Sequence, residues 1–438
     1  MKSRSYTAVV LIGVSLILSV LGTVSLMVRS ADVLQTSMLP ISYAWSVMLD
    51  SWKQLPQAIS GVGFERYLPT YLLHRPQEIN ATDFWNAGFS YGPTMILDTA
   101  VTQGVIGISA LCAMIALFIR MATHIHARYQ SIYHTIAVSM WIISLFLAPP
   151  LPVAFFLLSI LLVTYDESSH QSIGVRPLGY VVLAMLIIPL LVGGSFLMLQ
   201  MTRAEYGRSM VVQYVSSGNT ARAYNEMTHV VAAMPMVSNY HITMSQLTIS
   251  AVQALLVSST PDETGQVSDE DAALVSTLAN QAVSEAKRAT ILSPDNALMW
   301  AHVARVYQAL IGNAQNADQY TVASYRQAIA LDPINPTLHM DLGVVLAGLK
   351  QYDAALNEVR TALALKPDYP NAVYNLANIY RVKGDYDNAN SAIEQLKKMT
   401  ANDQKSLNQI TELEDQIRKD KEASMESATP TLAPTPTP

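Results

Sequence analysis

Cysteine is almost absent from this chain of 438 residues, since only Cys112 occurs. No intramolecular disulfide can therefore form, and a metal cluster held by several cysteines is excluded. Clusters of lysine and arginine are also missing, and the formal net charge is −6. Because nucleic-acid phosphates need a concentrated positive surface, we expect no nucleic-acid partner. His124, His126 and His134 surround one loop without an accompanying carboxylate, so we expect no metal site, and no cofactor.

Apolar residues are abundant, at 51% of the chain, and the mean hydropathy is +0.25. These values indicate a membrane-embedded part. The first predicted transmembrane helix lies within residues 1–29, where Tyr6–Val28 offers about the 20 apolar residues that a bilayer core requires. A cleaved signal peptide is the alternative, but the apolar run is long and no Ala-x-Ala site precedes Arg29.

Residues 93–200 are predicted to hold about four further transmembrane helices, of which the middle two are short. Proline removes an amide donor and clashes with the preceding helical turn, so Pro149-Pro150-Leu151-Pro152 divides the middle run into a tight hairpin or a re-entrant pair. The four apolar segments are Thr94–Ala122, Ile136–Pro149, Pro150–Tyr165 and Leu178–Gln200.

Basic residues in short loops predict the orientation, because such loops stay on the cytoplasmic side. Lys2 and Arg4 precede the first helix, whereas Arg120, Arg128 and Arg176 mark the later cytoplasmic loops. The loop of residues 30–92 and everything after residue 200 are therefore expected outside the cytoplasm.

The outer loop contains an apolar pattern at helical spacing: Ile41, Trp45, Met48, Trp52 and Leu55. This pattern predicts an amphipathic helix. It could lie on the membrane surface or pack on the membrane domain, and the sequence leaves both alternatives open.

Residues 201–400 show self-similarity with a period of thirty-four residues, the period of tetratricopeptide repeats. The chain resembles this repeat family, which implies a helical solenoid with a groove for a protein partner. Residues 401–424 are predicted to form a capping helix, and residues 425–438 a disordered Thr/Pro-rich tail. The expected packing positions of the last two repeats are Leu342, Gly343, Tyr352, Ala355, Pro367, Leu376, Tyr380, Tyr386 and Ala389.

The expected fold is therefore all-α, with polytopic transmembrane helices followed by an extracytoplasmic α-solenoid. A second resemblance concerns the stretch from Gly61-Val62-Gly63-Phe64 through Leu97 to Gly104-x-x-Gly107. Together with Arg75-Pro76, Asn80-x-Thr82, Trp85 and Phe89, it resembles the O-antigen ligase and polymerase family, in the variant that carries tetratricopeptide repeats.

This second resemblance implies transfer or polymerisation of a glycan from an undecaprenyl-pyrophosphate carrier at the membrane lipid surface. Guanidinium groups can grip and stabilise a departing pyrophosphate, so Arg66 and Arg75 are candidate catalytic residues. His74 could accept the proton of the acceptor. Asn80 and Trp85 are candidate substrate-binding residues, and Asn80-Ala81-Thr82 is expected to form a turn.

The chain also departs from this family. Pro93 and Thr94 stand where a His-Asn pair commonly lies, and the sequence looks like the C-terminal portion of the family architecture. Whether the protein is an enzyme therefore stays open. The alternative function is a non-catalytic scaffold of the bacterial cytoplasmic membrane, anchored there and binding an envelope protein through its repeats.

Overall fold

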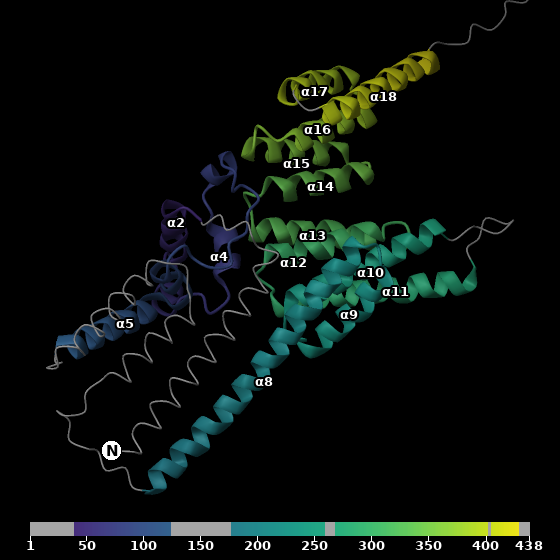
Figure 1. Cartoon of the computed structure of the whole chain (residues 1–438). Coiled ribbons are helices and arrows are strands. Elements are labelled where there is room, and N and C mark those ends of the chain that lie inside the picture. Colours follow the sequence, from purple (N-terminus) through teal and green to yellow (C-terminus); the bar gives the residue numbers. More distant parts are fainter. Residues whose placement is uncertain (1–38, 124–176, 259–267, 402–403, 429–438) are drawn as a thin grey trace, which may run out of the picture. The chain divides into compact units, whose positions relative to one another are not determined.

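The computed structural model describes residues 39–123, 177–258, 268–401 and 404–428, and every regular element in these ranges is helical (Figure 1). The all-α prediction is therefore confirmed. The chain divides into two compact units. The first unit holds residues 1–76 and 87–296, whereas the second unit holds residues 77–86 and 297–438.

The first unit contains the helices of the outer loop, the apolar helix that follows them, and two helical pairs. Their bounds are α2 Ile41–Ser51, α3 Leu55–Ser60, α4 Tyr67–His74, α5 Met95–Thr123, α8 Pro177–Ser216, α9 Thr220–Ala233, α10 Ser238–Ser258 and α11 Asp269–Leu292.

The helix α5 is interrupted at Gly104, whose φ of 62° and ψ of −154° are not helical. This interruption exposes carbonyls that a continuous helix would bond internally. Three consecutive carbonyls find partners in the outer loop: Trp52 donates its indole N–H to Ala100 O at 2.9 Å, Val62 N–H bonds Val101 O at 3.0 Å, and Gly63 N–H bonds Thr102 O at 2.9 Å. The glycine-rich loop therefore caps a break in α5.

Glycine is required on both sides of this contact. Gly61 has a φ of 72° and its α-carbon faces the backbone of Thr102 and Gln103. A Cβ on Gly104 would lie 2.6 Å from both Ala58 O and Gly61 N. Glycine alone tolerates such positive φ angles and close approaches without strain. The two glycine motifs of the sequence thus meet backbone to backbone.

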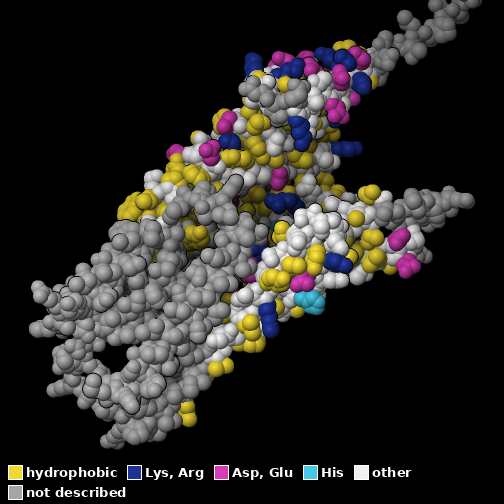
Figure 2. Space-filling view, in the orientation of Figure 1, with side chains coloured by type: hydrophobic (Ala, Val, Ile, Leu, Met, Phe, Trp, Pro, Cys, Tyr) yellow, Lys and Arg dark blue, Asp and Glu magenta, His cyan; other side chains and the backbone are white. Residues whose placement is uncertain are grey.

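The predicted amphipathic helix corresponds to α2, but its apolar residues divide between two faces. Met48 is buried together with Ala44 and Val47 on the face that packs against α4 and α5. Ile41 and Trp45, in contrast, remain 61% and 52% exposed. Figure 2 shows hydrophobic side chains on the surface in this region.

Two helical pairs complete the first unit: α8 pairs with α9, and α10 with α11. Their core contains Ala204, Val211, Ala223, Met227 and Tyr240. The helix α8 runs without interruption across residue 200, where the sequence analysis separates the membrane part from the repeats. One long helix therefore joins the two predicted regions.

The second unit consists of helical pairs and a final helix: η1 Gln77–Ala81, α12 Ala297–Ala309, α13 Ala317–Leu331, α14 Pro336–Gly348, α15 Tyr352–Leu365, α16 Pro370–Lys383, α17 Tyr386–Met399 and α18 Gln404–Ala428. Each pair packs on the next, and the first helices α14, α16 and α18 are neighbours. The final helix α18 occupies the region of the predicted capping helix, residues 401–424, and continues to Ala428 into the stretch predicted as a disordered tail.

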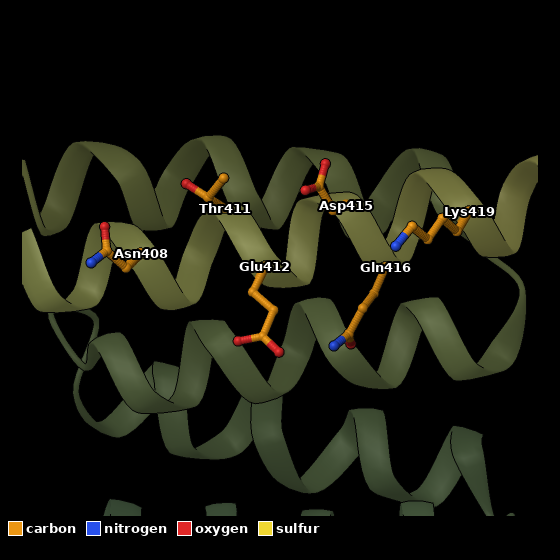
Figure 3. Close-up of a pocket in the computed structure, with 6 residues that line it drawn as sticks. All are labelled: Asn408, Thr411, Glu412, Asp415, Gln416 and Lys419. Atoms are coloured by element: carbon orange, nitrogen blue, oxygen red, sulfur yellow. The ribbon is translucent and has the colours of Figure 1, made fainter.

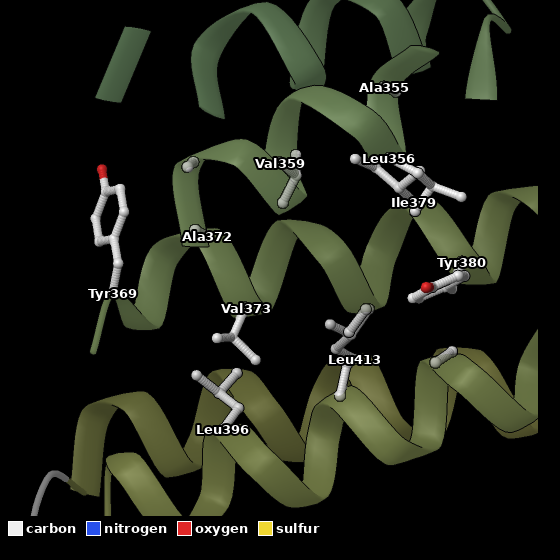
Figure 4. Close-up of a cluster of buried hydrophobic side chains, with 14 of the residues drawn as sticks. Ala355, Leu356, Val359, Tyr369, Ala372, Val373, Ile379, Tyr380, Leu396 and Leu413 are labelled. Atoms are coloured by element: carbon white, nitrogen blue, oxygen red, sulfur yellow. The ribbon is translucent and has the colours of Figure 1, made fainter. Parts of the chain in front are cut away.

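A continuous apolar core joins these pairs, as the close-up in Figure 4 shows for the part around Val359 and Val373. Four predicted packing residues are buried in it: Leu342, Ala355, Tyr380 and Ala389. Leu376 and Tyr386 pack against its edge and Tyr352 is half-buried, whereas Pro367 is exposed in the turn before α16. A Cβ on Gly343 would lie 2.6 Å from the Val359 side chain, so this glycine lets α14 approach α15 closely.

The polytopic membrane prediction is not supported by the described residues. Among the described helices, only the Met95–Ala113 part of α5 is long and apolar enough to cross a membrane. The predicted spans at Tyr6–Val28, Ile136–Pro149 and Pro150–Tyr165 lie outside the described residues, as do the loop histidines and residues 429–438.

Candidate interaction site on the helical repeats

The first helices of the second unit each leave one face incompletely buried. On α14 this face holds Thr337, Asp341 and Val344, which recur three to four residues apart. On α16 it holds Asn371, Tyr374, Asn378 and Arg381 at the same spacing. We call these seven residues the inner stripe. Because α14 and α16 are neighbours, the two parts of the inner stripe lie on adjacent helices.

The inner stripe carries a polar cluster at its α14 end. Burial raises the pKa of the Asp341 carboxyl to about 6, although the nearby positive charge of Arg305 opposes this shift. Burial also raises the pKa of the Tyr325 phenol, which donates a hydrogen bond to Gln308 Oε1 at 3.0 Å. Asp341 is half-buried and close to the positive charge of Arg305. This cluster can therefore accept hydrogen bonds from a bound chain and donate hydrogen bonds to it.

A second polar network lies at the α16 end. Arg381 donates to Asn378 Oδ1 through Nε at 3.1 Å and through Nη2 at 2.9 Å. The same guanidinium bonds Asp420 of α18 at 2.5 Å. These bonds hold Arg381 in one orientation and tie the last repeat to the final helix.

The surface of α18 contains a shallow polar hollow (Figure 3). All six lining residues come from this one helix, and Glu412 and Gln416 point away from Thr411 and Asp415. Side chains that diverge from a single helix do not form a pocket for a small molecule, which needs convergent polar groups. In the described part of the chain, no group of three His, Cys, Asp or Glu residues could hold a metal ion.

The residues predicted to bind substrate, Asn80 and Trp85, both lie in the second unit. Asn80 is buried, and its side-chain amide donates to Ile334 O at 2.9 Å. Trp85 packs on Tyr369 with ring centroids 5.2 Å apart. The predicted turn at Asn80-Ala81-Thr82 is confirmed, because η1 ends at Ala81 and Thr82 N–H bonds Ile79 O at 3.0 Å.

The predicted catalytic residues lie around α4 in the first unit. Arg66 immediately precedes this helix, is exposed, and has its Nε 3.5 Å from Asp295 Oδ2. Arg75 follows the same helix and is only 5% exposed. The eight residues of α4 span about 12 Å, so the two arginines flank opposite ends of this helix. His74 is half-buried, and burial lowers its pKa. Their catalytic role stays a prediction.

Two buried histidines with the same local geometry were missed by the sequence analysis. His241 contacts Glu285 at 2.6 Å and Pro235 O at 2.9 Å through its two ring nitrogens. His339 contacts Glu358 at 2.7 Å and Pro333 O at 3.1 Å in the same way. Each histidine follows its proline by six residues, and this shared spacing could have revealed the pair.

Comparison with known proteins identifies the helical pairs within residues 313–409 of the second unit. Two sequence descriptions of the tetratricopeptide repeat match residues 346–409 and 313–370. This part of the chain consists of tetratricopeptide repeats. The sequence prediction is thus confirmed for the repeats, whereas neither match extends to the Gly61–Gly107 stretch that resembles glycan ligases.

The solved structures that this chain matches include a thermophilic TPR protein of Thermus thermophilus, at 17% identity and a TM-score of 0.36. The match covers 48% of this chain and 98% of that chain. PilW, a type IV pilus biogenesis factor, matches at 16% identity and a TM-score of 0.36, over 51% of this chain and 93% of that chain. No curated protein matches the sequence.

Proposed function

We propose that this protein is a membrane-anchored scaffold whose tetratricopeptide repeats bind a partner protein. The inner stripe carries this proposal, because the repeats leave α14 and α16 with an accessible surface of mixed polar and apolar character. Such a surface suits an extended or helical segment of another protein, since it offers both hydrogen-bonding groups and apolar contacts.

Membrane anchoring is supported by apolar side chains that the protein leaves uncovered. Along the first half of α8, Met185, Val192 and Phe196 are each more than half exposed. Ile41 and Trp45 add an exposed row on α2. Along one helix such as α8, large exposed apolar side chains suit contact with a membrane or a partner. We place the protein in the bacterial cytoplasmic membrane, with the repeats outside the cytoplasm.

The scaffold function can be tested with a matched pair of asparagines. Asn371 is exposed on the inner stripe, and Asn390 is exposed on α17. Asn371→Arg should lower copurification of the partner at least about tenfold, because a long charged side chain would block a packed interface. Asn390→Arg should leave copurification at the wild-type level. Equal copurification by both variants would argue against binding at the inner stripe.

Glycan transfer from an undecaprenyl-pyrophosphate carrier is the second candidate function. The resemblance of Gly61–Gly107 favours it, but the glycines of this stretch already have a packing role in the contact with α5. If Arg66 grips pyrophosphate, Arg66→Ala should abolish glycan attachment in a deletion strain that carries the variant gene. If the protein is a scaffold instead, glycan attachment with Arg66→Ala should match that with the wild-type protein.

A further inference from the structure

Two turns of the repeat array occupy equivalent positions, and each begins and ends with proline. Residues 333–336 read Pro-Ile-Asn-Pro before α14, and residues 367–370 read Pro-Asp-Tyr-Pro before α16, one period later. These turns contribute a backbone carbonyl at Ile334, an ammonium group at Lys366 and an aromatic ring at Tyr369. We call Ile334, Lys366, Asp368 and Tyr369 the turn edge.

One residue of the outer loop contacts both turns. The side-chain amide of Asn80 donates to Ile334 O at 2.9 Å, while the backbone carbonyl of Asn80 accepts from Lys366 Nζ at 3.0 Å. These contacts join positions that are 254 and 286 residues apart in sequence. Asn80 therefore forms hydrogen bonds with two successive repeats.

Lys366 is the centre of this contact. It is only 7% exposed, and its ammonium group also bonds Asp368 Oδ1 at 3.0 Å. The same Nζ lies 5.1 Å from the centre of the Trp85 ring, within the range of a cation–π interaction. A buried ammonium needs such partners, because desolvation without them is costly. Residues 77–86, which we call the docked segment, supply two of these partners.

Hydrogen bonds within the docked segment stabilise its conformation. Thr82 Oγ1 donates to Ile79 O at 2.7 Å and accepts from Phe84 N–H at 3.2 Å. Trp85 N–H bonds Thr82 O at 3.3 Å, and Ile79 is fully buried. Local bonds of this kind restrict the conformations of the segment, which lowers the entropy cost of docking.

Two features of the contact between the docked segment and the turn edge favour reversible docking. Asn80 Oδ1 is buried without a hydrogen-bond partner among the described residues, and an unpaired buried acceptor weakens an interface. The docked segment is only ten residues long, and Glu78, Asp83 and Asn86 within it stay exposed. The chain enters the docked segment from the first unit at Pro76 and returns to it at Ala87.

We propose that the turn edge is a second protein-binding site of the repeats, distinct from the inner stripe, and that the chain's own docked segment occupies it. Its ligand is a short folded segment with a buried asparagine followed five residues later by an aromatic ring. This proposal does not depend on the scaffold function, because it concerns contacts within one chain.

Hydrogen–deuterium exchange of the full-length protein tests the docking. Lys366→Ala should speed exchange of the amides in residues 77–86 about tenfold, since local opening exposes Thr82 and Trp85 N–H. Lys383→Ala is the control, because Lys383 pairs with exposed Asp353. Equal exchange of residues 77–86 in both variants, or an unprotected segment in the wild-type protein, would overturn the proposal.

A change in the docked segment separates loss of docking from loss of the repeat fold. Trp85→Ala leaves the repeats unaltered in sequence, so residues 336–399 should keep wild-type exchange while residues 77–86 exchange faster. If Trp85→Ala leaves the exchange of residues 77–86 at the wild-type rate, the aromatic part of the contact is not what holds the segment, and the proposal fails.

A synthetic peptide with the sequence of residues 77–86 tests recognition by the site. The full-length Asn80→Ala/Trp85→Ala protein should bind this peptide at least about tenfold more tightly than the wild-type protein, whose tethered segment competes at high effective concentration. Adding Lys366→Ala should remove the binding. Absence of binding to the double variant at millimolar peptide, or binding unaffected by Lys366→Ala, would contradict the proposal.

Discussion

Two parts of the outer loop, residues 61–63 and the docked segment, make contacts of different chemistry. The first contact is made by backbone groups and the second largely by side chains. In the first unit, residues 61–63 bond the backbone of α5 at its break, so the contact needs glycine and little else. In the second unit, the docked segment relies on the side chains of Asn80, Trp85 and Lys366. A backbone contact of the first kind is rigid, whereas a side-chain contact of the second kind can be weakened, strengthened or exchanged by single substitutions.

Breaking the backbone contact should have the largest effect. Gly104→Ala would place a Cβ against Ala58 O and Gly61 N at a positive φ, which should cost about 3 kcal/mol or more. Thermal unfolding in detergent micelles should show a clear fall in the midpoint. Gly194→Ala in α8 is the control, because its Cβ would meet nothing within 4 Å. Equal midpoints for the two variants would mean that the close approach at Gly104 is not needed.

The stability of the two units should depend on pH in opposite directions, because one histidine in each unit has a shifted pKa. Burial lowers the pKa of His302 in the second unit to about 4, so its neutral form is favoured and stability falls as the pH drops from 6.5 towards 4. The loss is on the order of 2 kcal/mol at pH 4.5. In the first unit, the hydrogen bond that the protonated His241 donates to Glu285 raises the pKa of His241. The contribution of His241 to stability is therefore full below pH 6.5 and is lost as the pH rises through the raised value.

Unfolding of the repeats measured between pH 7 and pH 4.5 checks this difference. His302→Leu should flatten the loss of stability in acid, because the variant has no buried imidazole to protonate. The exchange of α10 amides reports on His241, and their protection should fall above neutral pH. A His302→Leu protein with the same acid sensitivity as the wild-type protein would refute the assignment.

Weakening the side-chain contact should have a smaller effect on stability. Asn80→Ala removes the bond to Ile334 O but keeps the carbonyl that Lys366 contacts, so we expect a loss of about 1 kcal/mol. Chemical unfolding of the repeats provides the measurement, with Asn390→Ala as the control. A stability equal to that of the control would indicate that the docked segment adds nothing to the repeat fold.

Arg66→Ala should have the smallest effect. Its side chain is 54% exposed, and the ion pair with Asp295 spans 3.5 Å, so its removal should change the free energy of unfolding by less than about 0.5 kcal/mol. Chemical unfolding of the variant and of Lys53→Ala, another exposed cation, should agree within this range. A much larger loss for Arg66→Ala alone would assign this arginine a structural role in the outer loop.

The sequence predicted the repeats well because their packing is local and periodic. The fixed spacing of Leu342, Ala355 and Ala389 reflects the nesting of one helical pair on the next, and each position lies in the core. The docking of Asn80 was missed, since a contact across 254 residues leaves no local pattern. The motif Gly104-x-x-Gly107 was recognised in the sequence. The hydrogen bonds from Val62 and Gly63 to carbonyls of α5 were not predicted, because they depend on the break in that helix.

The most direct test of the scaffold function is photo-crosslinking in living cells from single positions on the repeats. A benzophenone amino acid at Asn371, on the inner stripe, should give one dominant crosslinked protein, and the same probe at Asn390 on α17 should not. A benzophenone probe captures only neighbours in direct contact, so the difference maps the binding surface. Crosslinks of equal yield from both positions, or none from Asn371, would contradict a scaffold that binds its partner at the inner stripe.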